Sequence, residues 1–201
     1  MAWTEQSQVV IDQEFNGSSD FIDLGDTNDP SGSYTIEAEI RPDSLVGSQN
    51  GHRILSKEDG TTGWALSIGD NSTAGRLRSF NREASDLGLV DADGVIVLST
   101  WQHVAVVYDS SDSSVKIYYD LILKTTGSMD SDTVDNSHTM LIGAQNDGSG
   151  GHTRFFDGKM RRVRLWTRAL SLSELTLYNG KDVDVRSVTG LAVQRIGWTS
   201  Q

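Results

Sequence analysis

The sequence contains no cysteine, which excludes disulfide bonds and thiolate metal sites in this chain. It also lacks any apolar run of the roughly 20 residues that a membrane-spanning helix needs. Basic residues are in the minority, with 17 Lys and Arg against 28 Asp and Glu and a formal net charge of −11. Such a surface repels phosphate backbones and anionic lipid head groups, so we expect no nucleic-acid partner and no membrane partner.

The N-terminal residues 1–8, MAWTEQSQ, have neither the basic start nor the apolar stretch of a secretory signal peptide. The chain shows no internal repeat and no low-complexity linker. At 201 residues it fits a single all-β domain that buries enough surface to need no covalent staples. We therefore expect a soluble chain without a signal peptide.

Residues 100–120 predict a β-hairpin. Two apolar, β-branched runs, 101–108 and 115–119, are joined by polar residues that favour a turn. The first run is apolar at both alternating sets of positions, so it should be covered on both faces inside a sandwich. We interpret this strand as core.

Turn-rich stretches separate short β-type runs along the rest of the chain, which is typical of an antiparallel sandwich. We predict an all-β fold, an antiparallel two-sheet β-sandwich with one short helix. That helix should lie between Ser171 and Tyr178, because Ser171 and Glu174 have the spacing of a capping box. The charges and glycine of residues 81–93 favour a loop or a frayed edge strand.

Several motifs occur in the order found in laminin-G-like, concanavalin A-like jelly rolls, a superfamily that includes the pentraxins. WQHVAVVYD followed by KIYYD resembles the signature hairpin of that family. The other motifs resemble its first strand pair, a long strand, a hairpin with a Gly-rich tip and the closing strands; they are FNGSSDFIDLG at 15–25, YTIEAEIRP at 34–42, RILSKEDGTTGWALSI at 53–68, MLIGAQNDG at 140–148 and FFDGKMRRVRLWTRALSLSEL at 156–175. The resemblance implies a jelly-roll domain at 1–180, followed at 181–201 by a tail or edge strand that contacts a partner.

The resemblance also implies where this chain binds. Pentraxin-type relatives draw calcium ligands from a loop similar to the one that contains Gln145, Asn146 and Asp147, so Ca²⁺ is the expected cofactor. The alternative is that these residues simply form a turn. Family members bind ligands through rim loops, and here these contain the candidate ligand-binding residues Asn50, His52, Asn81, Arg82, His152 and Arg154.

No catalytic residues are predicted. Glu37 and Glu39 share one face of a strand, as a glycosidase pair would, but the pattern lacks the further carboxylate expected in glucanases. We interpret the two as a solvated face. His103 lies within the hairpin strand and is expected to be partly buried and hydrogen-bonded, and the side chains of Trp64, Trp101 and Trp166 should be packed.

These observations predict a non-catalytic binding or assembly protein. The first interpretation is an adhesion or decoration subunit displayed on a virus or phage particle, as a homo-oligomer or within a virion, with a glycan or protein surface as its partner. The second is a carbohydrate-binding module cut from a larger secreted enzyme or adhesin, which would be extracellular. A lyase or hydrolase is the third.

Overall fold

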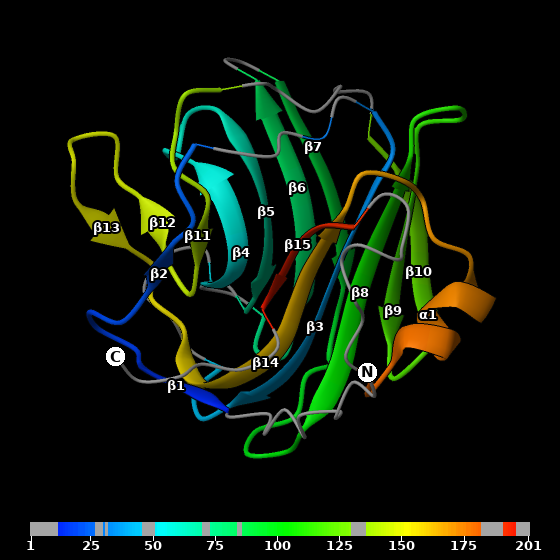
Figure 1. The fold of residues 1–201 in the computed structure, drawn as a ribbon, viewed down its shortest axis with the longest axis horizontal. Coiled ribbons are helices and arrows are strands. Elements are labelled where there is room, and N and C mark those ends of the chain that lie inside the picture. Colours follow the sequence, from blue (N-terminus) through cyan, green and yellow to red (C-terminus); the bar gives the residue numbers. More distant parts are fainter. Residues whose placement is uncertain are drawn as a thin grey trace, which may run out of the picture.

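The computed structural model describes residues 12–26, 30, 32–45, 51–69, 73–83, 86–129, 136–181 and 191–195. Two antiparallel sheets stack face to face, and a small hairpin projects from one side of the sandwich (Figure 1). The predicted all-β sandwich is confirmed. The helix in the described part of the chain is too short to cross a membrane.

The seven-stranded sheet has the order β1-β14-β3-β8-β9-β10, and β15 also pairs with β14. Its strands are β1 (Gln13–Asn16), β3 (Tyr34–Pro42), β8 (Gln102–Asp109), β9 (Ser114–Tyr119), β10 (Ile122–Ser128), β14 (Asp157–Trp166) and β15 (Leu191–Arg195). Because β1 pairs with the first half of β14 and β15 with the second, these two short strands share one edge of the sheet. Within the predicted tail 181–201, β15 is thus an edge strand.

The six-stranded sheet has the order β2-β11-β4-β5-β6-β7. Its strands are β2 (Ile22–Asp23), β4 (His52–Glu58), β5 (Gly63–Ile68), β6 (Leu77–Glu83), β7 (Asp86–Ala92) and β11 (Leu141–Ile142). Next to β11, β12 (Gln145–Asn146) and β13 (His152–Thr153) form the projecting hairpin. Of the stretch 81–93, residues 81–83 and 86–92 are strand, and β7 lies at the edge of this sheet. Val90 and Ala92 are buried, whereas Asp91 between them pairs with Arg78.

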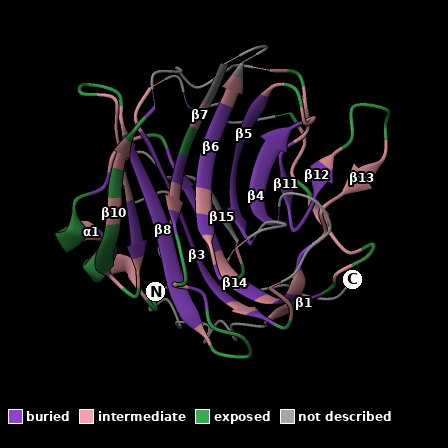
Figure 2. Ribbon diagram, turned by 180° about the vertical axis from the view of Figure 1, so that it is seen from behind, coloured by how far each residue is buried: buried purple, intermediate pink, exposed green. Residues whose placement is uncertain are grey.

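Side chains from both sheets fill the space between the layers, as the two-residue period of strands requires. Ile36 and Val104 meet Trp64 and Leu66 from the opposite sheet in one cluster of buried residues. Figure 2 shows that β3, β4 and β8 are buried along most of their length, whereas β10 is exposed. The predicted burial of Trp64 and Trp166 is confirmed, while Trp101 is only half-buried, beneath the Arg161 guanidinium at 4.2 Å.

The predicted hairpin is confirmed as β8 and β9, and β8 is covered on both faces. Val104 and Val106 face the interior, whereas Ala105 and Val107 pack in a second cluster with Leu175. Leu175 belongs to α1 (Leu172–Tyr178), which covers the outer face of the seven-stranded sheet. The predicted capping box is confirmed, because the Ser171 hydroxyl accepts from the Glu174 N–H and the Glu174 carboxylate accepts from the Ser171 N–H.

The interpretation of Glu37 and Glu39 as a solvated face is wrong, since their exposed fractions are 0% and 9%. Glu37 accepts hydrogen bonds from His103 Nε2 at 2.9 Å, Arg164 Nη1 at 2.9 Å and Trp166 Nε1 at 3.0 Å. Donors on β8 and β14 thus satisfy the hydrogen-bonding capacity of a carboxylate on β3, which the sequence pattern alone predicts to be hydrated. The expected burial and hydrogen bonding of His103 are confirmed by the same contact.

Candidate functional site

Charged side chains lie around one aromatic ring on the outer face of the six-stranded sheet. Register places Arg82 of β6 and Glu58 of β4 opposite the same β5 residue, Gly63. Phe80 and Arg53 project from this face too, because their neighbours in β5 alternate with the core residues Trp64 and Leu66.

Arg53 is the central cation of this face. It is 1% exposed, its Nε donates to Glu58 Oε1 at 2.5 Å, and its Nη2 donates to Gln145 Oε1 at 2.8 Å. Its guanidinium carbon lies 5.0 Å from the centroid of the Phe80 ring, and that of Arg82 lies 5.8 Å from the same centroid. Phe80 thus holds two cations close together on one surface.

Arg154 brings a third guanidinium group to this place from a different part of the chain. Its backbone has φ = +56°, a left-handed conformation, and its carbonyl accepts from the Arg53 N–H at 3.1 Å. Burial lowers the pKa of Arg154, the charge of Glu58 opposes that shift, and the charge of Arg82 adds to it. Among the described residues, the Arg154 guanidinium has no hydrogen bond or ion pair.

The charges in this cluster are not balanced. Three guanidinium groups, those of Arg53, Arg82 and Arg154, lie close to one another, and the one carboxylate among them, that of Glu58, pairs with Arg53. Burial lowers the pKa of Arg53 to about 10, Glu58 opposes the shift, and the two neighbouring guanidinium groups add to it. We call these four residues the arginine cluster; it is an excess of positive charge on a chain whose formal net charge is −11.

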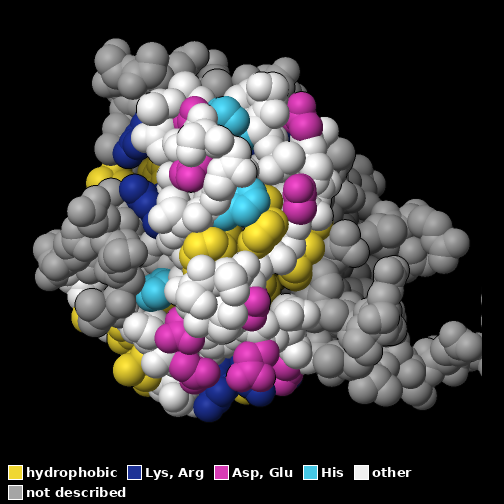
Figure 3. Space-filling model, turned by 90° about the vertical axis from the view of Figure 1, so that its left-hand side faces the viewer, with side chains coloured by type: hydrophobic (Ala, Val, Ile, Leu, Met, Phe, Trp, Pro, Cys, Tyr) yellow, Lys and Arg dark blue, Asp and Glu magenta, His cyan; other side chains and the backbone are white. Residues whose placement is uncertain are grey.

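A ridge of partly exposed rings lies beside the arginine cluster. The rings of Phe21 and His152 have centroids 4.1 Å apart, and the rings of Phe21 and Phe155 have centroids 6.4 Å apart. Figure 3 shows hydrophobic and histidine side chains gathered on the side of the molecule that carries β2, β12 and β13, with acidic side chains around them. We call Phe21, His152 and Phe155 the aromatic ridge.

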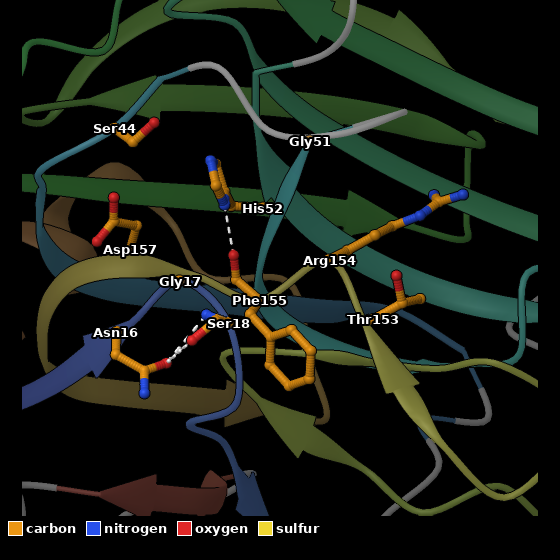
Figure 4. Close-up of a pocket in the computed structure, with 10 residues that line it drawn as sticks. All are labelled: Asn16, Gly17, Ser18, Ser44, Gly51, His52, Thr153, Arg154, Phe155 and Asp157. Carbon is orange, nitrogen blue, oxygen red and sulfur yellow. Dashed lines mark hydrogen bonds between the residues drawn. The ribbon is translucent and has the colours of Figure 1, made fainter.

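Two pockets border the aromatic ridge, one lined in part by Phe155 and the other by His152. The first, of about 340 Å³, is lined by Asn16, Gly17, Ser18, Ser44, Gly51, His52, Thr153, Arg154, Phe155 and Asp157 (Figure 4). The second, of about 430 Å³, is lined by Asp23, Ser137, His138, Thr139, Asn146, Gly148, Gly150 and His152. Hydroxyl, amide and carboxylate side chains line both pockets, and such groups suit a ligand rich in hydroxyls.

A family model described as the concanavalin A-like lectin/glucanases superfamily matches residues 16–176. The chain belongs to this superfamily. The predicted resemblance is thus confirmed for this concanavalin A-like protein, and no curated protein sequence matches it.

Solved structures share the fold of this concanavalin A-like protein. A candidate carbohydrate-binding protein from Bacteroides ovatus is 25% identical with a TM-score of 0.72; the alignment covers 94% of this chain and 52% of the other, about half its length. The CBM40 of Ruminococcus gnavus IT-sialidase, solved with α2,3-sialyllactose, is 18% identical with a TM-score of 0.65, covering 85% and 99%. A heptameric SAP-like pentraxin from Limulus polyphemus is 18% identical with a TM-score of 0.62, covering 92% and 94%.

The structure separates the sequence-predicted ligand residues into groups. His52 and Arg154 line the first pocket, His152 lines the second, and Arg82 lies in the arginine cluster that Arg154 joins. Asn81 faces the core instead: it is 0% exposed, and its Oδ1 accepts from the Tyr34 hydroxyl at 3.2 Å. Asn50 lies outside the described residues.

The predicted calcium residues are all engaged within the protein. Gln145 Oε1 accepts from Arg53, and Asn146 Nδ2 donates to the carbonyls of Glu58 and Thr139. Asp147 Oδ1 accepts from Ser149 and Gly151, and these hydrogen bonds lower the pKa of Asp147. The described residues contain no group of three or more His, Cys, Asp or Glu that fits a metal ion. A guanidinium on Gln145 opposes a divalent cation there, so this donor set does not fit a preformed calcium site.

Sequence reasoning missed Glu58, Phe80, Phe21, Phe155 and Asp157. Each stands in a run whose alternation indicates an ordinary strand or turn. Only the pairing of β4 with β5 and β6, and the return of residues 152–157 beside β4, brings them together.

Proposed function

We propose that this protein is a non-catalytic glycan-binding domain whose ligand contains an acidic sugar. The arginine cluster carries the proposal. Arg82 and Arg154 are half-buried and lie close enough to repel each other, and the one carboxylate of the cluster, that of Glu58, is paired with Arg53. A sugar carboxylate would relieve this repulsion and accept charge-assisted hydrogen bonds from the guanidinium groups.

The aromatic ridge supports a sugar as the carrier of that carboxylate. Sugars present apolar faces bordered by hydroxyl groups, which pack on aromatic rings and bind polar groups beside them. Phe21 and Phe155 are partly exposed, and Phe155 and His152 of the ridge line the two pockets. The CBM40 that was solved with sialyllactose has this fold, and a sialylated glycan is acidic.

Binding without turnover is supported by the state of the buried glutamates. Hydrolysis of a glycoside requires two carboxylates that face one cleft. Glu37 and Glu39 are ion-paired with Arg164, Arg161 and Arg162, and Glu58 is paired with Arg53. We expect no release of sialic acid or of reducing sugar from a bound glycan.

The test is isothermal titration calorimetry with sialyllactose and with lactose. We expect sialyllactose to bind, lactose to bind more weakly, and Arg154→Gln to reduce the sialyllactose affinity at least tenfold. Since the Arg154 side chain has no ion pair to described residues, the change should leave the fold intact.

The matched control is Arg41→Gln, because Arg41 is 30% exposed and pairs with Asp43 outside the cluster. Its sialyllactose affinity should equal that of the unchanged protein. Affinity should also fall as salt rises, since screening weakens partly exposed charge pairs. Equal affinity for both sugars, or no effect of Arg154→Gln, would contradict an acidic ligand.

Assembly on a virus particle and an extracellular location stay predictions of the sequence. The chain spans 52% of the Bacteroides ovatus protein, which favours the interpretation as a module of a larger protein. Light scattering on the purified chain separates the two: a monomer that binds glycans supports the module, and a stable oligomer supports assembly.

A further inference from the structure

We propose that the first pocket, beside His52, is a second subsite that binds the hydroxyl groups of the sugar linked to the acidic unit. The inference rests on the proposed function. Its volume of about 340 Å³ lies within the range of small-ligand pockets, about 300–1,000 Å³. The residues that define it are His52 and Asp157, with Arg154 at its border.

The ring of His52 is held in one orientation. Its Nδ1 makes a hydrogen bond to the carbonyl oxygen of Phe155, and its side chain is only 6% exposed (Figure 4). A carbonyl oxygen only accepts, so Nδ1 carries a proton, and in the neutral imidazole with that tautomer Nε2 is an acceptor. The backbone at Phe155 therefore sets which hydrogen-bonding group His52 offers.

That acceptor has no partner among the described residues. Nε2 of His52 is buried and makes no hydrogen bond to them, and Figure 4 shows this nitrogen on the side of the ring that points away from Phe155, between Ser44 and Gly51. A buried polar atom without a partner is unfavourable, so nearly all such atoms in proteins are paired. An unpaired acceptor in a pocket wall calls for a ligand that brings a donor.

Asp157 provides a second acceptor in the same pocket. Its carboxylate has no hydrogen bond among the described residues, and its side chain stands beside Gly17. Gly17 leaves room for that carboxylate, because a Cβ at residue 17 would lie 2.9 Å from Asp157 Cβ. Two unpaired acceptors in one pocket fit a polyhydroxylated unit, whose hydroxyl groups donate.

Arg154 connects this pocket to the arginine cluster. Its backbone forms part of the pocket wall, while Figure 4 shows its side chain extending away from the pocket. At its far end the guanidinium interacts with Glu58 and Arg82. An arginine side chain is comparable in length to one pyranose ring, so the two sites are placed for adjacent sugars of one chain.

The test compares sialyllactose with free sialic acid. His52→Asn keeps a donor near the Phe155 carbonyl but removes the Nε2 acceptor, and Asp157→Asn removes the carboxylate without changing its size. We expect each to lower sialyllactose affinity about tenfold and to leave the affinity for free sialic acid unchanged. Ser137→Ala, in the second pocket, is the matched control and should change neither affinity.

The imidazole nitrogen signals of His52 provide an independent readout. On sialyllactose binding, the Nε2 signal should shift while the protonated Nδ1 signal stays, with His52→Asn identifying both peaks. The proposal would be overturned if both variants lost affinity for sialyllactose and for free sialic acid equally, or if the Nε2 signal did not move in a saturated sialyllactose complex. If neither sialyllactose nor free sialic acid binds, the proposal of an acidic ligand is wrong. Titration with lactose then tests the pocket by itself, and a His52 Nε2 signal that lactose does not move would overturn the subsite as well.

Discussion

At the scale of single residues, one glycine decides how the site is built. Gly63 lies opposite both Glu58 and Arg82, and its φ of +111° is far from what other residues adopt. A Cβ there would overlap the carbonyl oxygen of Lys57. These two charged residues therefore flank a position that only glycine fills without strain.

Gly63→Ala should destabilise the protein by about 2–4 kcal/mol, because it adds backbone strain and a clash with main-chain atoms. The measurement is the urea midpoint with an unchanged slope. Gly94→Ala is the control, since Gly94 has φ of +66° but nothing within 4 Å of the added Cβ. The Gly94→Ala variant should lose only about 1–2 kcal/mol of unfolding free energy. Equal losses would show that the close approach at Gly63 contributes nothing.

At the scale of elements, β3, β8 and β14 are joined by a buried ionic network around Glu37. Burial would raise the pKa of Glu37, but the hydrogen bond from His103 and the charge of Arg164 outweigh it, and the pKa falls below its ordinary 4.5. The unfolded chain then takes up the proton first as the pH falls. This carboxylate stabilises the fold above about pH 4.5, and that contribution is lost at lower pH.

Glu37→Gln should therefore destabilise the protein near pH 7 by about 3–5 kcal/mol, because Arg164 would keep a buried charge without its counter-ion. The difference from the unchanged protein should shrink as the pH falls below 4.5. Urea midpoints from pH 3 to pH 7 provide the measurement. Glu14→Gln is the control: Glu14 is 72% exposed and should change stability by less than about 0.5 kcal/mol. A constant difference across the pH range would contradict the role of Glu37.

At the scale of the whole molecule, calcium binding stays a prediction of the sequence. Because Gln145 Oε1 accepts from Arg53, an ion would have to replace that hydrogen bond, and we expect any site to be weak. At a calcium concentration ten times a millimolar Kd, the stabilisation would be about 1.4 kcal/mol, or a rise in Tm of about 4 °C.

The measurement is thermal unfolding in calcium and after chelation. Sodium chloride of equal ionic strength is the control, because salt alone screens the repulsion within a chain of net charge −11. Asp147→Asn should abolish the calcium-specific part of the rise. A Tm that is the same in calcium, in chelator and in matched salt would contradict the prediction of calcium binding.

The whole molecule also explains why the two halves of the proposed site are far apart in the chain. Arg82 belongs to β6, whereas Arg154 follows β13 in the second half of the sequence. The left-handed backbone at Arg154 and its hydrogen bond to Arg53 bring the later segment beside β4. A non-glycine residue held in this conformation is a strained position of the kind that occurs at binding sites.

The sequence by itself determined the sandwich, the β8–β9 hairpin, the capped helix and the superfamily. The first three follow from local alternation, turn residues and the Ser171–Glu174 spacing, which act over a few neighbouring residues. The superfamily came from the resemblance of ordered motifs to those of known jelly rolls. It also placed His52, Arg82, His152 and Arg154 among the rim candidates.

Only the tertiary structure decided which of these meet and which are buried. Glu37 looks solvent-facing in its own strand, yet partners from two other strands enclose it. Asn81 looks like a loop residue in the sequence, yet its side chain accepts a hydrogen bond from the Tyr34 hydroxyl in the core. Strand register and the return of residues 152–157 fix these contacts, and contacts between residues distant in sequence leave no periodic signal along the chain.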